Sequence, residues 1–303
     1  MNDRTLLDEF SALASHEQMA LAQLALIGEP TGRTALLDQL RAAGIQDAGA
    51  QALTVASFDD VLRKLERLAY ISVVVGRGFV CNPKLCWPAL RAAIAQHQLA
   101  DLCRAYEALV PLRQTWNSSE PRSYRAGIAR LRMGYLRGHT PQQIQPLLAF
   151  CLGSYEAAQL HPVLELFGRP FEAELIGRIH PLLQDDVLVV LLQSAQYAVS
   201  TAAPLRQYCE QHRQQRLAAG DEVSPELRMA MAEDAILCGR CDAAQQYLQH
   251  TEGWYSVYLG ASITLLRGDS NAALAAYDAA LKALRRETGK RTRIFSGLGS
   301  YLY

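Results

Sequence analysis

Hydrophobic and polar positions along the chain repeat mostly at three- and four-residue spacing, the pattern of helices with one buried face. Near the N-terminus this pattern predicts three helices: residues 16–27, 33–43 and 58–69. Gly44 would end the second of these helices, and Ser57 would cap the third. Residues 71–81 differ, because two short β-branched and aromatic runs flank a Gly-Arg-Gly turn, which predicts a β-hairpin.

The order of three helices and a hairpin resembles a winged-helix domain over roughly residues 15–90. The resemblance rests on the phrase SFDDVLRKLERLAYISVVVGRGFVCNP, in which Tyr70 and Ile71 start the first wing strand. Three leucines of the third helix would face the core: Leu62, Leu65 and Leu68. The resemblance implies DNA binding with helix 58–69 in the major groove. The candidate contacts are four cations: Arg63, Lys64, Arg67 and Arg77.

The charge of this region leaves a second interpretation open. Residues 1–90 contain eight Lys or Arg against ten Asp or Glu, and the third helix itself carries Asp59, Asp60 and Glu66. A helix that reads a DNA groove needs cations around it to meet the phosphates. The alternative is a winged helix used for protein contacts or as a packing unit.

From about residue 97 onward the pattern predicts helix after helix with short loops. In residues 254–287, Gly268 marks a turn, and Ala273, Tyr277 and Ala280 follow it at offsets of five, nine and twelve. These offsets resemble the small and aromatic positions of a tetratricopeptide repeat. The small residues let two helices approach closely, and the aromatic ring fills the gap between them.

The preceding residues, 225–250, repeat this pattern with Gly239, Ala244 and Leu248. The two turn glycines lie 29 residues apart, whereas the usual repeat is about 34 residues long. We therefore predict a mainly α protein with two domains: a winged helix over residues 1–95 and a tetratricopeptide-like α-solenoid over residues 96–303. The apolar end, residues 294–303, has no polar capping helix, so we expect the chain to be the front part of a longer polypeptide; the alternative is that this segment folds back as a buried tail.

Composition narrows the class of protein. Half of the 303 residues are hydrophobic, one fifth are charged, and the net charge is zero, which excludes a disordered chain and a globally basic one. The longest apolar run, residues 187–192, is far shorter than the roughly 20 residues that cross a bilayer, and the N-terminus lacks a signal-peptide pattern. We expect a cytoplasmic protein without membrane contact, whose seven scattered cysteines form no disulfide framework.

Two basic stretches could follow a phosphate backbone. Residues 121–137 contain five arginines, with Tyr124 and Tyr135 between them and no acid: Arg122, Arg125, Arg130, Arg132 and Arg137. Residues 282–293 contain six cations against one acid: Lys282, Arg285, Arg286, Lys290, Arg291 and Arg293. The alternative for both stretches is a solvated helix face with the tyrosines in the core.

No catalytic motif stands out, so we predict that the chain is not itself an enzyme and has no cofactor or metal site. Residues 28–34 look faintly like a phosphate-binding loop, but three residues rather than four separate the glycines, and Arg33 stands where Lys belongs. Cys238 and Cys241 form a single CxxC pair, half of a zinc site. The acidic pair at residues 185–186 is interpreted as helix N-terminal charge.

Residues 277–295, YDAALKALRRETGKRTRIF, resemble a segment of the N-terminal helical regions of large bacterial Swi/Snf-type, DEAD/DEAH-box-like helicases. This resemblance implies an accessory module of an ATP-dependent DNA helicase or translocase. It would bind DNA, a protein partner or the remainder of a longer chain. Two alternatives remain: a transcription regulator with a winged-helix DNA reader and a repeat-based sensor, and a pure protein-interaction scaffold.

Overall fold

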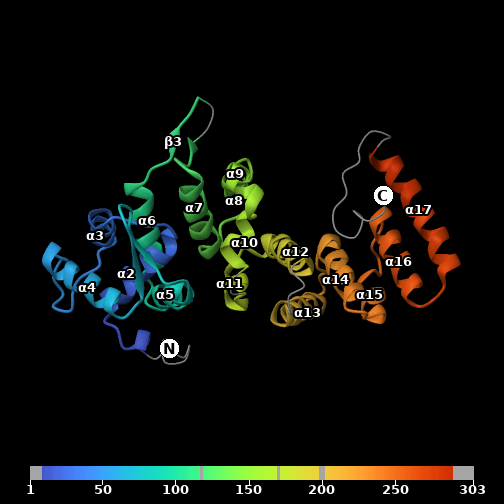
Figure 1. The fold of residues 1–303 in the computed structure, drawn as a ribbon, viewed down its shortest axis with the longest axis horizontal. Helices are drawn as coiled ribbons and strands as arrows, with labels where there is room; N and C mark the ends of the chain where they lie inside the picture. The colour runs from blue at the N-terminus through green and yellow to red at the C-terminus, as the bar shows by residue number, and fades with distance from the viewer. Residues whose placement is uncertain (1–8, 117–118, 169–170, 198–201, 289–303) are drawn as a thin grey trace. The chain divides into compact units, whose positions relative to one another are not determined.

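The computed structural model describes residues 9–116, 119–168, 171–197 and 202–288. The described chain is mainly helical, which confirms the predicted class (Figure 1). Its contacts divide it into two compact units, Met1–Pro162 and Val163–Tyr303. Within the described ranges, no helix has both the length and the apolar character that a membrane crossing requires.

The first unit combines helices with two short hairpins. Its elements in chain order are α2 (Ser15–Ile27), α3 (Arg33–Ala42), α4 (Val55–Arg67), β1 (Ile71–Val74), β2 (Gly78–Cys81), α5 (Pro83–Ala95), α6 (Leu99–Leu109), β3 (Arg113–Gln114), β4 (Ser119–Glu120), α7 (Tyr124–Leu136), α8 (Pro141–Leu152) and α9 (Tyr155–Gln159). The strands pair antiparallel, β1 with β2 and β3 with β4. The three helices and the hairpin predicted between residues 16 and 81 are therefore present.

Helix α2 is the centre of the first unit. Every residue from Glu17 to Ile27 is buried, and the helix packs against α3, α5, α7 and β2. A helix that is apolar on all sides is stable only when neighbours cover all sides. Its one deeply buried amide, Gln23, donates a hydrogen bond to Gln39 Oε1 at 2.7 Å. Because α6 and α7 pack on α3 and α2, the compact unit extends past the predicted boundary at residue 95.

The third helix, α4, begins three residues earlier than predicted. Thr54 is its N-cap: the Thr54 hydroxyl accepts from the Ser57 N–H at 3.1 Å, and the Ser57 hydroxyl accepts from the Thr54 N–H at 3.0 Å. Ser57 thus completes a reciprocal capping box from inside the helix. The predicted core positions Leu62 and Leu65 are buried, whereas Leu68, at the C-cap, is half-buried.

The β1–β2 hairpin is fixed to the segment between α2 and α3. The Thr31 and Phe79 backbones exchange two N–H···O hydrogen bonds, each 2.9 Å long, so Thr31 forms a bridge at the edge of β2. This close approach requires glycine at position 78, whose φ is +117°. A Cβ at Gly78 would lie 2.3 Å from the Thr31 carbonyl oxygen.

The second unit is built from paired helices. Its elements are α10 (Pro162–Phe167), α11 (Ala173–Arg178), α12 (Pro181–Tyr197), α13 (Ala203–Ala218), α14 (Pro225–Leu237), α15 (Cys241–Tyr247), α16 (Trp254–Leu266) and α17 (Ser270–Thr288). Helix α14 packs against α12, α15 and α16, and α16 packs against α17. Gly239 and Gly268 lie in the turns inside the last two pairs, with φ of +70° and +92°.

A buried carboxylate connects three helices of this unit. Asp185 on α12 lies 2.8 Å from His212 Nε2 on α13 and accepts from the Ser224 N–H, at the N-cap of α14, at 2.6 Å. Burial opposes ionisation of Asp185, but these two hydrogen bonds outweigh it and lower the pKa of the carboxyl. The acid predicted as a helix N-terminal charge is thus a cross-helix partner.

Replacing Gly78 with Ala should destabilise the first unit strongly. Gly78→Ala should lower its free energy of unfolding by about 3 kcal/mol, because a strained backbone combines with loss of the bridge to Thr31. Gly76→Ala in the same hairpin is the control: its φ is +71° with nothing near the new Cβ, so it should cost about 1 kcal/mol.

Urea denaturation followed by Trp87 fluorescence measures both effects. The background is Trp116→Phe with Trp254→Phe, which leaves the buried Trp87 of α5 as the sole indole. Equal losses for the two glycine variants would contradict the proposed role of the Thr31 contact.

Candidate nucleic-acid interface

Three of the four cations predicted on the third helix and hairpin lie on the surface. Arg63 and Arg67 are exposed on α4, and Arg77 is exposed in the turn between β1 and β2. Within the described residues, Arg67 and Arg77 have neither an ion pair nor a side-chain hydrogen bond. Their guanidinium groups therefore keep all their donors for an outside partner.

Arg63 and Lys64 are held to different degrees. Arg63 pairs with Asp60 at 2.6 Å, but both side chains are largely exposed. Such a surface pair contributes at most about 1 kcal/mol, so Arg63 can exchange its partner for a phosphate. Lys64 lies 2.7 Å from the carboxylate of Glu17, which is buried and also accepts from the Ala14 N–H. Lys64 therefore connects α4 to the start of α2.

The acids of α4 balance much of its positive charge. Asp59 pairs with Arg33 of α3 at 3.0 Å, and Asp60 pairs with Arg63. Glu66 is exposed beside Arg67 in the sequence. The surface of the third helix and hairpin consequently has two or three cations for phosphates rather than a broad basic face.

The arginines of residues 121–137 mostly serve the fold of the first unit. Arg130 donates to the Val110 carbonyl and Arg132 to the Leu26 carbonyl, each at 2.7 Å. Arg137 pairs with Glu107 at 3.1 Å. Sequence reasoning missed these roles, because an arginine on an amphipathic helix looks the same whether it binds a backbone carbonyl inside the protein or a phosphate outside it.

The remaining groups of this stretch are only partly available. Tyr124 and Tyr135 are buried, so their rings do not form a stacking surface for bases. Arg125 lies over the Tyr124 ring, 5.6 Å from its centroid. Arg125 also interacts with the charge of Glu29. Burial raises the pKa of Glu29, and the positive charge of Arg125 offsets part of this rise. Arg122 is exposed and directly precedes Ser123, the N-cap of α7.

The second basic stretch lies partly in the described chain. Lys282, Arg285 and Arg286 are exposed on α17. Arg285 and Arg286 lie in its last turn, where cations favour the helix dipole. The three other candidates lie outside the described residues: Lys290, Arg291 and Arg293.

The two weak chemical motifs lie at helix ends. Gly28 ends α2 with φ of +71°, and the guanidinium of Arg132 lies where a Cβ at this position would stand. Cys238 is the C-cap of α14, and Cys241 is the first residue of α15. Over the described ranges, no three His, Cys, Asp or Glu side chains gather as metal ligands would.

No family model matches the chain, and neither a curated protein nor a solved structure shows significant similarity to it. The argument for function therefore rests on the residues and contacts described above.

The two arginines Arg132 and Arg122 should respond differently to substitution. Arg132→Ala removes a charged donor from a carbonyl at the end of the buried helix α2, so it should cost the first unit roughly 1.5–3 kcal/mol. Arg122→Ala removes an exposed side chain and should change stability by less than about 0.5 kcal/mol. Urea denaturation with the Trp87 reporter measures both. An unaltered midpoint for Arg132→Ala would show that its hydrogen bond does not support the fold.

Proposed function

We propose that the chain is a non-catalytic binding module that contacts nucleic acid through a winged-helix fold in its first unit. The observation that carries the proposal is the pairing of Thr31 with Phe79, together with the order of α2, α3, α4 and the hairpin. This pairing fixes the hairpin to the helices. Arg67 and Arg77 are thereby presented on a defined scaffold rather than on a free loop.

The proposed fold of the second unit is a tetratricopeptide-like solenoid. Support comes from the buried small residues Ala244, Ala273 and Ala280, which occupy the positions where two helices must approach closely. The Tyr277 ring lies 5.3 Å from that of Tyr258, and the Tyr277 hydroxyl donates to Ser262 Oγ at 3.0 Å. An aromatic side chain thus fills the space between α16 and α17, as the repeat pattern requires.

The proposed context is the N-terminal accessory region of a bacterial ATP-dependent DNA helicase or translocase. In that role the module would deliver DNA to a motor located elsewhere in a larger protein. Its expected compartment is the cytoplasm, where such a motor meets DNA. The small number of available cations favours sequence-tolerant contact through phosphates, because sequence reading needs several side chains at base edges. A transcription regulator, by contrast, would be a dimer with a preferred operator sequence.

A second candidate function is protein contact through the same surface. It is favoured by the ion pairs that neutralise α4 and by two exposed valines of the hairpin, Val73 and Val75. Exposed apolar side chains near a balanced set of charges suit a protein surface better than a phosphate backbone. This candidate predicts no affinity for nucleic acid at ordinary salt.

Fluorescence anisotropy with labelled single- and double-stranded DNA of random sequence, titrated at several salt concentrations, separates the two candidates. The wild-type chain should bind, and log K should fall with log salt. Replacing both Arg67 and Arg77 with Ala should flatten that slope by about 0.9 for each lost phosphate contact, which is about 1.8 in total.

A matched variant controls for the loss of net charge. Replacing Arg104 and Arg113 with Ala also removes two exposed arginines of the first unit, but these belong to α6 and β3 rather than to α4 and the β1–β2 hairpin. Its salt slope should remain that of the wild type. Equal slopes for all three proteins would refute contact through the third helix and hairpin, and absence of binding at low salt would favour the protein-contact candidate.

A further inference from the structure

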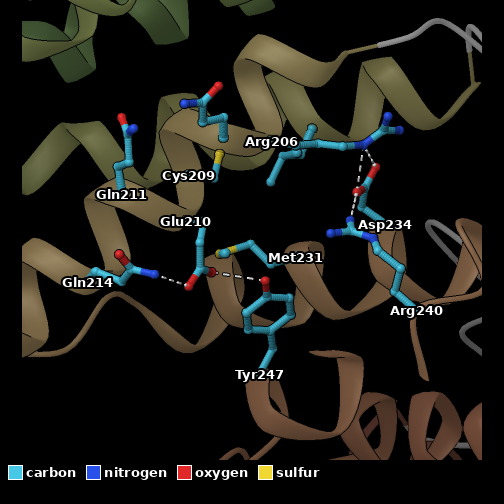
Figure 2. A pocket seen from close by; sticks show the side chains of 11 residues that line it. Arg206, Cys209, Glu210, Gln211, Gln214, Met231, Asp234, Arg240 and Tyr247 are labelled. Atoms are coloured by element: carbon cyan, nitrogen blue, oxygen red, sulfur yellow. Dashed lines mark hydrogen bonds and ion pairs between the residues drawn. The ribbon is translucent and has the colours of Figure 1, made fainter. Parts of the chain in front are cut away.

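The second unit contains a hollow of about 320 Å³ that is lined by residues of α12, α13, α14 and α15 (Figure 2). One face of α13 forms a wall, because Arg206, Glu210 and Gln214 follow at four-residue intervals. Tyr247 and the N-cap residue Arg240 belong to α15. This hollow takes no part in the function proposed above, which concerns the first unit.

A buried carboxylate orients two arginines at one end of the hollow. Asp234 on α14 is buried, and both of its oxygens accept from Arg206 Nε, at 2.9 and 2.8 Å. One of these oxygens also accepts from Arg240 Nη2 at 3.1 Å. Figure 2 shows the two guanidinium groups on either side of this carboxylate. The hydrogen bond from Arg206 to Asp234 raises the pKa of Arg206, so the guanidinium stays charged.

Both oxygens of the second carboxylate in the hollow already accept hydrogen bonds from the protein. Glu210 accepts from Arg213 through both oxygens, from the Gln214 amide at 2.8 Å and from the Tyr247 hydroxyl at 2.9 Å. Burial opposes the ionised form, but these donors outweigh it and lower the pKa of Glu210. Both acids of the hollow therefore accept hydrogen bonds from the protein itself. The hollow has more N–H donors than these two acids use.

Those surplus donors define the ligand. No hydrogen bond within the described residues uses the two Nη groups of Arg206, or Nε and Nη1 of Arg240. The two Nη groups of Arg206 form a free fork that matches the planar, bidentate geometry of a carboxylate, and Arg240 keeps further single N–H donors beside it. Arg206 and Arg240 share a single acid, Asp234, whereas Glu210 is paired with Arg213. The group of two arginines and Asp234 therefore has one positive charge in excess, which suits a ligand with one negative charge better than a dianionic phosphate.

The rest of the lining favours a peptide over a small molecule. Small-molecule sites are lined mostly by apolar groups, whereas seven of the eleven lining residues here have charged or amide side chains. The glutamine amides at positions 207, 211 and 214 carry both donors and acceptors, as a peptide backbone requires. We propose that this hollow binds an acidic peptide segment, with one carboxylate accepting from the N–H groups of Arg206 and Arg240 that Asp234 leaves free.

The test uses the full chain with arginine side chains labelled by ¹⁵N, observed by NMR. The probe is the blocked tripeptide acetyl-Ala-Glu-Ala-amide, and the comparison peptide has Gln in place of Glu. The Glu peptide should shift the Arg206 and Arg240 Nε signals saturably at concentrations on the order of 10 mM or below, as expected for a short ligand. The Gln peptide should leave these signals in place.

Variants locate the binding. Arg240→Gln should weaken the binding of the Glu peptide at least about tenfold, because it removes the positive charge and the free guanidinium donors but keeps an amide donor. Arg267→Gln is the matched control: Arg267 is 48% exposed against 46% for Arg240, and it likewise pairs with an acid, Asp242. This control should bind like the wild type.

Three results would overturn the proposal. The first is no shift of either signal with the Glu peptide, and the second is an equal shift with the Gln peptide. The third is tighter binding of inorganic phosphate than of the Glu peptide, which would show an anion site without peptide selectivity. None of these results bears on DNA contact by the first unit, so the two proposals fail independently.

Discussion

The burial of α2 from Glu17 to Ile27 is the constraint on which the first unit depends. From Met19 to Leu26, no residue of this helix is more than 2% exposed. Neighbours must therefore cover it on all sides, and α3, α5, α7 and β2 do so. Its C-terminal carbonyls also need partners inside the protein: Leu24 is met by the Gly28 N–H and Leu26 by Arg132. The arginines near this helix end are consequently part of the fold.

The sequence predicted elements better than it predicted contacts. Apolar spacing located α2, α3, α4 and the hairpin, because each of these follows from local periodicity. The predicted start of α4 was three residues too late. Thr54 and Ser57 are both residue types that form helix N-caps, and only the reciprocal hydrogen bonds in the folded chain show that Thr54 is the N-cap. The Thr31 bridge has no sequence signal at all, because one residue in a loop pairs with a strand 48 positions later.

The candidate cations show the same limit. The sequence offers Arg63, Arg67, Arg130 and Arg132 equally as candidate phosphate contacts. In the structure, Arg63 and Arg67 are exposed, whereas Arg130 and Arg132 donate to carbonyls of other segments of the first unit. Arg130 and Arg132 reach carbonyls of other segments, whereas Arg63 pairs with an acid of its own helix and Arg67 has no partner within the described residues; charge counting cannot make this distinction. In the second unit, likewise, Asp234 organises two arginines only because α13, α14 and α15 place them together. The proposed interfaces are therefore smaller and more specific than the basic stretches in the sequence.

The central claim, that α4 and the β1–β2 hairpin contact DNA, is tested most directly by hydrogen exchange with and without a random-sequence duplex at low salt. The account predicts slower exchange of backbone amides in residues 55–81 when DNA is present, with the amides of residues 203–247 unchanged. Unchanged exchange in residues 55–81 under conditions where DNA is bound would contradict the account and assign the contact to another part of the chain.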